Sequence, residues 1–173
     1  WGLPTAPTRT KTGALTIPRC NITLRSIARH RRKQHCPENK ENIGVAKANN
    51  QGIIKAIEDR CSQILIINND VEFEANLIKK LLKVQEEKDC SLIAPKMRYF
   101  DIPNNIWYAG SWFVKNKAYL PIHRGMNEID NGQYDKCVQI EYAPTCCLLV
   151  KKEVFQDVGM MDEKYFVYFD DTD

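Results

Sequence analysis

The chain has 173 residues, 43% of them apolar, and a formal net charge of +3. This length suits a single domain that can bury a core. The longest aliphatic run covers only residues 64–67, whereas a membrane span needs about 20 apolar residues, so neither a transmembrane helix nor an apolar signal peptide is predicted.

The charge is divided unevenly. Residues 1–37 contain eight Lys or Arg and no acid, while residues 38–173 hold 17 basic and 22 acidic residues, a net −5. Because Pro and Gly interrupt residues 1–37 without a regular period, a disordered basic arm, a targeting peptide and a stretch not native to the domain all stay open. We favour the last. Nucleic-acid binding by this segment is disfavoured, since a charge run is usually only solvated.

From Glu41 onward the pattern becomes regular. Apolar residues at helical spacing predict a helix over 41–59, and a β-branched run predicts a strand over 62–69 that is buried on both faces. A second helix is expected over 74–88 and a short strand over 89–95. This alternation predicts an α/β domain with a mostly parallel sheet, spanning residues 38–173.

After Pro95, aromatic and turn residues alternate. We expect strands over 138–142 and 146–150, then a short helix over 152–158 that ends at Gly159, a typical C-terminal cap. The last residues, 161–173, are both aromatic and acidic. The seven cysteines include no Cys-x-x-Cys pair, which argues against zinc or a disulfide framework and favours thiols in a reducing compartment.

Three polar groups could carry chemistry. Asn68, Asn69 and Asp70 follow the apolar strand, and ligands of open α/β sheets bind at that edge. Oxygen ligands there suit Mg²⁺ or Mn²⁺. Taken alone, however, Asn-Asn-Asp is also good turn chemistry.

The second group is the acidic cluster 170–173, which follows an aromatic run and could supply a general base. A solvated acidic tail is the alternative. The third group, Asn42, Gly44 and Asn49, could approach a ligand at a helix start. An Asn42 cap and ordinary helix packing would explain it equally well.

Taken in chain order, these features resemble family 2 glycosyltransferases, particularly the rhamnosyltransferase-like branch. The resemblance rests on five spaced blocks within residues 41–173: Asn42 to Ile53, Ile64 to Asp70, Trp107 to Asp135, Thr145 to Phe155, and Gly159 to Asp173. It implies a partial GT-A fold, a Rossmann-like sheet flanked by helices, and inverting transfer from a nucleoside-diphosphate sugar.

The resemblance also implies a role for each candidate residue. Asp70 would hold Mg²⁺ or Mn²⁺ on the diphosphate, and Asp171 would be the general base. The nucleotide side would comprise Asn42, Gly44, Asn49, Asn68 and Asn69, and the acceptor side Trp107, Thr145, Cys146, Asp170 and Asp173. Thr145 stands where the family usually has Gly, and Asp170 where it usually has Glu.

The sequence also departs from the family. The apolar first strand and the second α/β unit have no counterpart in residues 1–37, and the chain stops at Asp173, so we expect a domain truncated at both ends. A catalytically inactive fragment, or a nucleotide-binding module with a basic tail, is the alternative to an enzyme. A nucleotidyltransferase is disfavoured, because no Gly-rich phosphate loop is visible.

The expected partners are a nucleotide-sugar donor and a glycan or lipid-linked acceptor. We expect a cytoplasmic location, with peripheral contact at the inner face of the membrane as a further option.

Overall fold

The computed structural model describes residues 39–167 and 171–172, so the basic segment 1–37 lies outside the described residues, as do Asp170 and Asp173. The elements in chain order are α1 (Val45–Glu58), β1 (Gln63–Ile67), α2 (Leu77–Glu87), β2 (Leu92–Ile93), β3 (Met97–Arg98), β4 (Ile106–Tyr108), β5 (Ser111–Val114), the 3-10 helix η1 (Lys115–Lys117), β6 (Leu120–His123), β7 (Cys147–Lys151) and α3 (Lys152–Asp157). The predicted helices over 41–59, 74–88 and 152–158 are confirmed, with ends a few residues inside the expected bounds. None of the described helices is long and apolar enough to cross a membrane.

The central sheet has the strand order β1-β7-β2. β7 is antiparallel to both neighbours, and its register with β1 runs from Gln63 opposite Lys151 to Ile67 opposite Cys147. The prediction of a mostly parallel sheet is therefore wrong for the described strand pairs. β1 and β2 point the same way, but β7 lies between them. The apolar run of β1 indicated burial on both faces, and burial does not fix the direction of the neighbouring strand.

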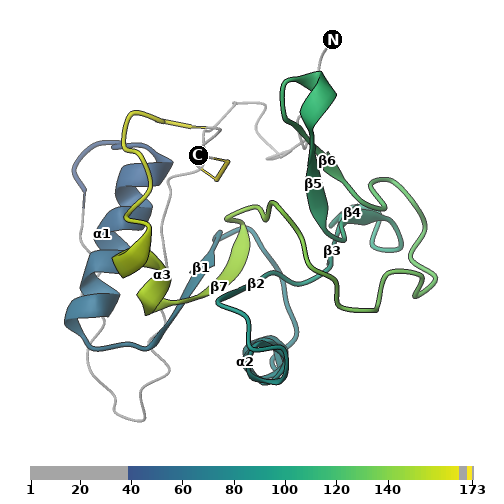
Figure 1. The fold of residues 1–173 in the computed structure, drawn as a ribbon, viewed down its shortest axis with the longest axis horizontal. Coiled ribbons are helices and arrows are strands. Elements are labelled where there is room, and N and C mark those ends of the chain that lie inside the picture. Colours follow the sequence, from purple (N-terminus) through teal and green to yellow (C-terminus); the bar gives the residue numbers. More distant parts are fainter. Residues whose placement is uncertain (1–38, 168–170, 173) are drawn as a thin grey trace.

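Helices cover both faces of this sheet. One face packs against α1 and α3, through a cluster that comprises Ile53, Ala56, Ile64, Ile66, Leu148 and Val150, with Val154 and Phe155 of α3 against it. α2 lies across the other face, and Figure 1 shows α1 and α3 together on one side of the strands and α2 on the opposite side. We call these three helices and three strands the core. Full burial of an Ile or Leu side chain here contributes roughly 1.5–3 kcal/mol.

The aromatic middle of the chain forms two hairpins, β3–β4 and β5–β6, which with residues 124–142 we call the hairpin region. Arg124 holds its centre together. The Nε of Arg124 donates to the Ala109 carbonyl at 2.8 Å, and its guanidinium lies over the rings of Trp112 and Tyr134. Such cation–π contacts stabilise by about 0.5–2 kcal/mol each.

The strand predicted over 138–142 is not formed. The backbone N–H groups of Glu141 and Tyr142 instead donate to the Ser111 carbonyl, at 3.0 and 3.4 Å. This segment therefore packs against the hairpins, with the ring of Tyr142 on that of Phe113, without forming a strand ladder. The neighbouring strand predicted over 146–150 is confirmed as β7.

Candidate functional site

The predicted strand-end motif lies where β1 leaves the core. The Asn68 N–H donates to the Cys146 carbonyl at 3.0 Å, which extends the β1–β7 ladder by one residue. Asn69 and Asp70 then form a turn, and all three side chains of the motif are exposed. The turn and a ligand site are therefore compatible, because the turn presents the Asp70 carboxylate to solvent beside the end of the sheet.

The Asp171 carboxylate lies near this strand end. Tyr142 donates its hydroxyl to Asp171 Oδ2 at 3.0 Å. Burial raises the pKa of the Cys146 thiol to about 12, and the charges of Cys147, Asp171 and Asp70 add to the effect. The predicted metal ligand and the predicted base therefore both lie near residues 145–146, since Asp70 follows Asn68, which bonds the Cys146 carbonyl, and Asp171 lines a pocket with Thr145.

The raised pKa limits the chemistry of the Cys146 side chain. At neutral pH the side chain stays a thiol, whereas nucleophilic attack and metal ligation require the thiolate. Its sulfur lies 3.3 Å from the Met97 sulfur. Cys146 therefore contributes by packing, through its contact with Met97.

A pocket of about 490 Å³ opens next to Asp171. Thr145 and Asp171 both line it, together with Tyr142 and Glu141. Thr172 and Gly159 also line it, and apolar side chains form the rest of the described wall: Ile66, Leu92, Phe113, Ala143, Leu148, Val150, Val154, Phe155, Val158, Met160 and Met161. The pocket thus has a mostly apolar wall with a few polar groups, among them the Glu141 and Asp171 carboxylates, which is the usual make-up of a small-molecule site.

An aromatic cluster connects Trp107 to this pocket. The ring of Trp107 meets His123 edge-on at 5.4 Å, and His123 stacks on Tyr142 at 5.8 Å between ring centroids. Burial lowers the pKa of His123, against opposing effects from the Trp107 backbone and the Asp171 charge. His123 is therefore neutral at pH 7, and its Nδ1 is buried without a hydrogen-bond partner among the described residues.

Three of the predicted nucleotide-side residues, Asn42, Gly44 and Asn49, lie at or near the start of α1. Asn42 Oδ1 accepts from the Gly44 N–H at 3.1 Å, and the Val45 N–H donates to the Phe166 carbonyl at 2.9 Å. Asn49 is only 5% exposed, and its amide contacts the sulfur of Met161 at 3.5 Å. This contact gives Asn49 a structural role that does not need a nucleotide.

The start of α1 and the end of β1 lie at the same end of the core. α1 packs against β1, and only residues 59–62 connect them, so the two elements run in opposite directions. Figure 1 shows this arrangement. Asn42 and Gly44 are therefore on the same side of the core as Asn68, Asn69 and Asp70.

Within residues 39–167 and 171–172, no group of three or more His, Cys, Asp or Glu side chains is arranged to hold a metal ion. A site completed by substrate phosphates needs only one or two protein carboxylates. Asp70, an exposed carboxylate at a sheet end, fits that requirement as a single hard oxygen ligand. A Mg²⁺ or Mn²⁺ ion is therefore compatible with the residues present if the ligand supplies the other oxygens.

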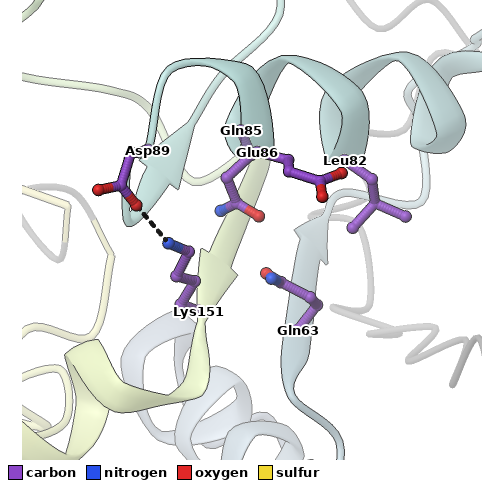
Figure 2. A pocket seen from close by; sticks show the side chains of 6 residues that line it. All are labelled: Gln63, Leu82, Gln85, Glu86, Asp89 and Lys151. Atoms are coloured by element: carbon purple, nitrogen blue, oxygen red, sulfur yellow. Dashed lines mark ion pairs between the residues drawn. The ribbon is translucent and has the colours of Figure 1, made fainter.

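A second hollow, of about 310 Å³, lies between the sheet and α2 (Figure 2). Gln63 and Lys151 reach it from the strands, and Lys151 Nζ is 3.5 Å from Asp89 Oδ1. Gln85 is 1% exposed and donates to the Ser91 carbonyl at 3.1 Å. None of the predicted site residues lines this hollow.

Tyr142 and His123 were not predicted as site residues. Tyr142 falls inside a segment that we expected to be a strand, and the sequence around it carries no motif of its own. The only available signal for Tyr142 was its position three residues before Thr145, just ahead of one of the ordered blocks.

The fold and the site together define an α/β protein with a polar strand end at one edge of its sheet and with Asp171 in the wall of a largely apolar pocket. A model of the family "Glycosyl transferase family 2" matches residues 24–159, most of the chain. The chain belongs to this family. The match also includes residues 24–37 of the basic segment.

Two relatives narrow the comparison. The chain is 29% identical over 157 residues to the "dTDP-rhamnosyl transferase RfbF" of Shigella flexneri, covering 90% of this chain and 49% of the relative. It is 22% identical over 134 residues to the "Low-salt glycan biosynthesis hexosyltransferase Agl10" of Haloferax volcanii, covering 76% of this chain and 42% of the relative. The expected rhamnosyltransferase-like relationship is confirmed, and the chain spans about half the length of these relatives.

Proposed function

We propose that residues 38–173 carry the catalytic part of an inverting, metal-assisted transfer of a sugar from a nucleoside-diphosphate sugar to a hydroxyl of a glycan or lipid-linked acceptor. The observation that carries this proposal is that the strand end leading to Asp70 bonds the Cys146 carbonyl through Asn68, while Asp171 lines a pocket with the neighbouring Thr145. One carboxylate then serves the donor and the other the acceptor.

On the acceptor side, Asp171 is the base. It takes the proton of the acceptor hydroxyl as that oxygen bonds to the anomeric carbon and the bond to the diphosphate breaks. A positioned base of this kind contributes about 10²–10⁴-fold in rate. A single displacement by the acceptor oxygen inverts the configuration at the anomeric carbon. Support comes from the pocket, where Asp171 and Thr145 share one wall.

On the donor side, Asp70 would hold Mg²⁺ or Mn²⁺, with Asn68 and Asn69 beside it. Such an ion supplies charge neutralisation for the departing nucleoside diphosphate. Asn42 and Gly44, at the same end of the core, would lie along the nucleotide. Asn49 belongs to this proposal only through its position on the same helix, because its amide is already engaged by Met161.

The relatives suggest which donor to try first. The name of RfbF points to dTDP-rhamnose as the donor, and that of Agl10 to transfer of a hexose. We also propose a cytoplasmic location, with peripheral contact at the inner face of the membrane as a further option. Cys90, Cys137, Cys146 and Cys147 are free thiols within the described part of the chain, as a reducing compartment maintains.

The test is turnover of dTDP-rhamnose with Mn²⁺, in which an added acceptor sugar or water takes the rhamnosyl group, followed as release of dTDP in the wild-type chain and in Asp171→Asn. We expect the variant to bind donor as tightly as the wild type but to lose about 10²–10⁴-fold in rate. Donor binding with no turnover in the wild type would instead favour the alternative, a nucleotide-binding module. Equal turnover in both proteins would remove Asp171 as the base.

A further inference from the structure

Tyr142 donates a side-chain hydrogen bond to the proposed base. Its hydroxyl lies 3.0 Å from Asp171 Oδ2, and the two residues come from segments 29 positions apart. Hydrogen bonds from a neutral donor to a carboxylate are stronger than those between neutral groups. A contact of this kind can fix the orientation of the carboxylate.

Tyr142 is itself held on its backbone and on its ring. Tyr108, which is 1% exposed, donates its hydroxyl to the Tyr142 carbonyl at 2.8 Å. On the ring, His123 stacks at 5.8 Å with 27° between the planes, and Phe113 packs in a tilted orientation at 6.0 Å. The phenol is therefore presented to Asp171 by a rigid aromatic support.

The protonation state of Tyr142 suits a permanent donor. Burial raises its pKa well above the usual range, and the charge and hydrogen bond of Asp171 raise it further, followed by Cys146 and Tyr108. The Tyr142 hydroxyl therefore keeps its proton around neutral pH. Tyr142 thus cannot compete with Asp171 as the proton acceptor.

We propose that Tyr142 is a positioning residue for the Asp171 base, holding Oδ2 so that Oδ1 is left to accept the proton of the acceptor hydroxyl. This inference rests on the proposed function. In the step it serves, the acceptor proton moves to Asp171 and Tyr142 retains its own. The new bond forms between the acceptor oxygen and the anomeric carbon, and the electron pair of the broken bond leaves with the diphosphate.

The first experiment tests the contact without requiring activity. In protein labelled with ¹³C at the tyrosine Cζ, the signal that disappears in Tyr142→Phe belongs to Tyr142. We expect this signal to move in Asp171→Asn, because the carboxylate acceptor becomes a neutral amide. An unmoved signal would overturn the inference.

The second experiment tests the role. We expect Tyr142→Phe, which keeps the ring and its stacking, to lower kcat by about 10- to 100-fold, the range that corresponds to a hydrogen bond with a charged group. The KM for the donor should stay within about twofold, because the donor side is untouched. A loss confined to KM would contradict a positioning role.

Tyr134→Phe is the matched control. Its hydroxyl also donates to a carboxylate, Glu128 Oε2 at 2.9 Å, but this pair lies in the hairpin region and outside the pocket. We expect kcat to be unchanged in this variant. Full kcat in Tyr142→Phe alongside an inactive Asp171→Asn would overturn the role of Tyr142 and leave the proposed function standing. Equal turnover in wild type and Asp171→Asn would remove the proposed function and the role of Tyr142 with it.

Discussion

Leu149 in the core and Ile106 in the hairpin region are both fully buried, but by different surroundings. Leu149 lies in the middle strand of a sheet with helices on both faces, whereas Ile106 lies in a two-stranded hairpin closed by loops. The core is buried by regular packing, and the hairpin region by single contacts such as those of Arg124, Tyr108 and Tyr134. The candidate site draws on both regions. The core fixes the strand end with Asp70, and the hairpin region supplies the aromatic support of Asp171.

The largest effect is expected from a cavity in the core. Leu149→Ala should cost about 2–5 kcal/mol of unfolding free energy, because strands and helices on all sides prevent collapse around the lost side chain. Ile106→Ala should fall at the lower end of that range, because two-stranded hairpins and loops can shift to fill the space. Urea unfolding of both variants measures the difference. A greater loss in Ile106→Ala would reverse the comparison.

A smaller effect is expected where the start of α1 meets the C-terminal segment. Gly44 has φ 86° and ψ 166°, and an added Cβ would lie 2.9 Å from the Phe166 carbonyl oxygen. Gly44→Ala should therefore destabilise by more than the roughly 1–3 kcal/mol of backbone strain alone.

Gly159→Ala is its control. Gly159 also has a positive φ, of 96°, but an added Cβ would meet nothing within 4 Å. This variant should carry only the backbone strain. Equal losses of stability in the two variants, measured by thermal unfolding, would show that the contact with Phe166 contributes nothing.

The smallest effect concerns pH and the aromatic cluster. Because burial lowers the pKa of His123 in the folded protein, the unfolded chain binds a proton at this residue first as the pH falls. Stability should therefore decrease as the pH drops below about 6.5, the ordinary histidine value. His123→Phe should reduce this decrease. Urea midpoints at pH 7 and pH 5 test this, and an unchanged pH dependence in the variant would contradict a buried neutral His123.

The sequence predicted the core better than the hairpin region, and for a physical reason. Helical spacing and the β-branched run report which face of an element is buried, so α1, α2 and β1 were found within a few residues of their ends. Neither signal reports strand direction. The insertion of β7 between β1 and β2 joins parts of the chain that are far apart in sequence, and no local pattern encodes it.

The candidate site likewise contains one part that the local sequence could predict and one part that it could not. Asp70 could be placed at a sheet end because its own neighbours define the strand. The contact between Tyr142 and Asp171 depends on where two loops meet, and the alternating residues around Tyr142 pointed to a strand that does not form. Asp170 and Asp173 remain predictions, since they lie outside the described residues.

The most direct test of the account is a donor titration of the wild-type chain and Asp70→Ala, each with and without Mn²⁺, using dTDP-rhamnose and monitored by calorimetry. We predict that Mn²⁺ strengthens donor binding by the wild type, because Asp70 and the diphosphate share the ion, and that Asp70→Ala loses this gain while remaining folded. A Mn²⁺-dependent affinity that is the same in Asp70→Ala as in the wild type would contradict the assignment of Asp70 as the metal ligand.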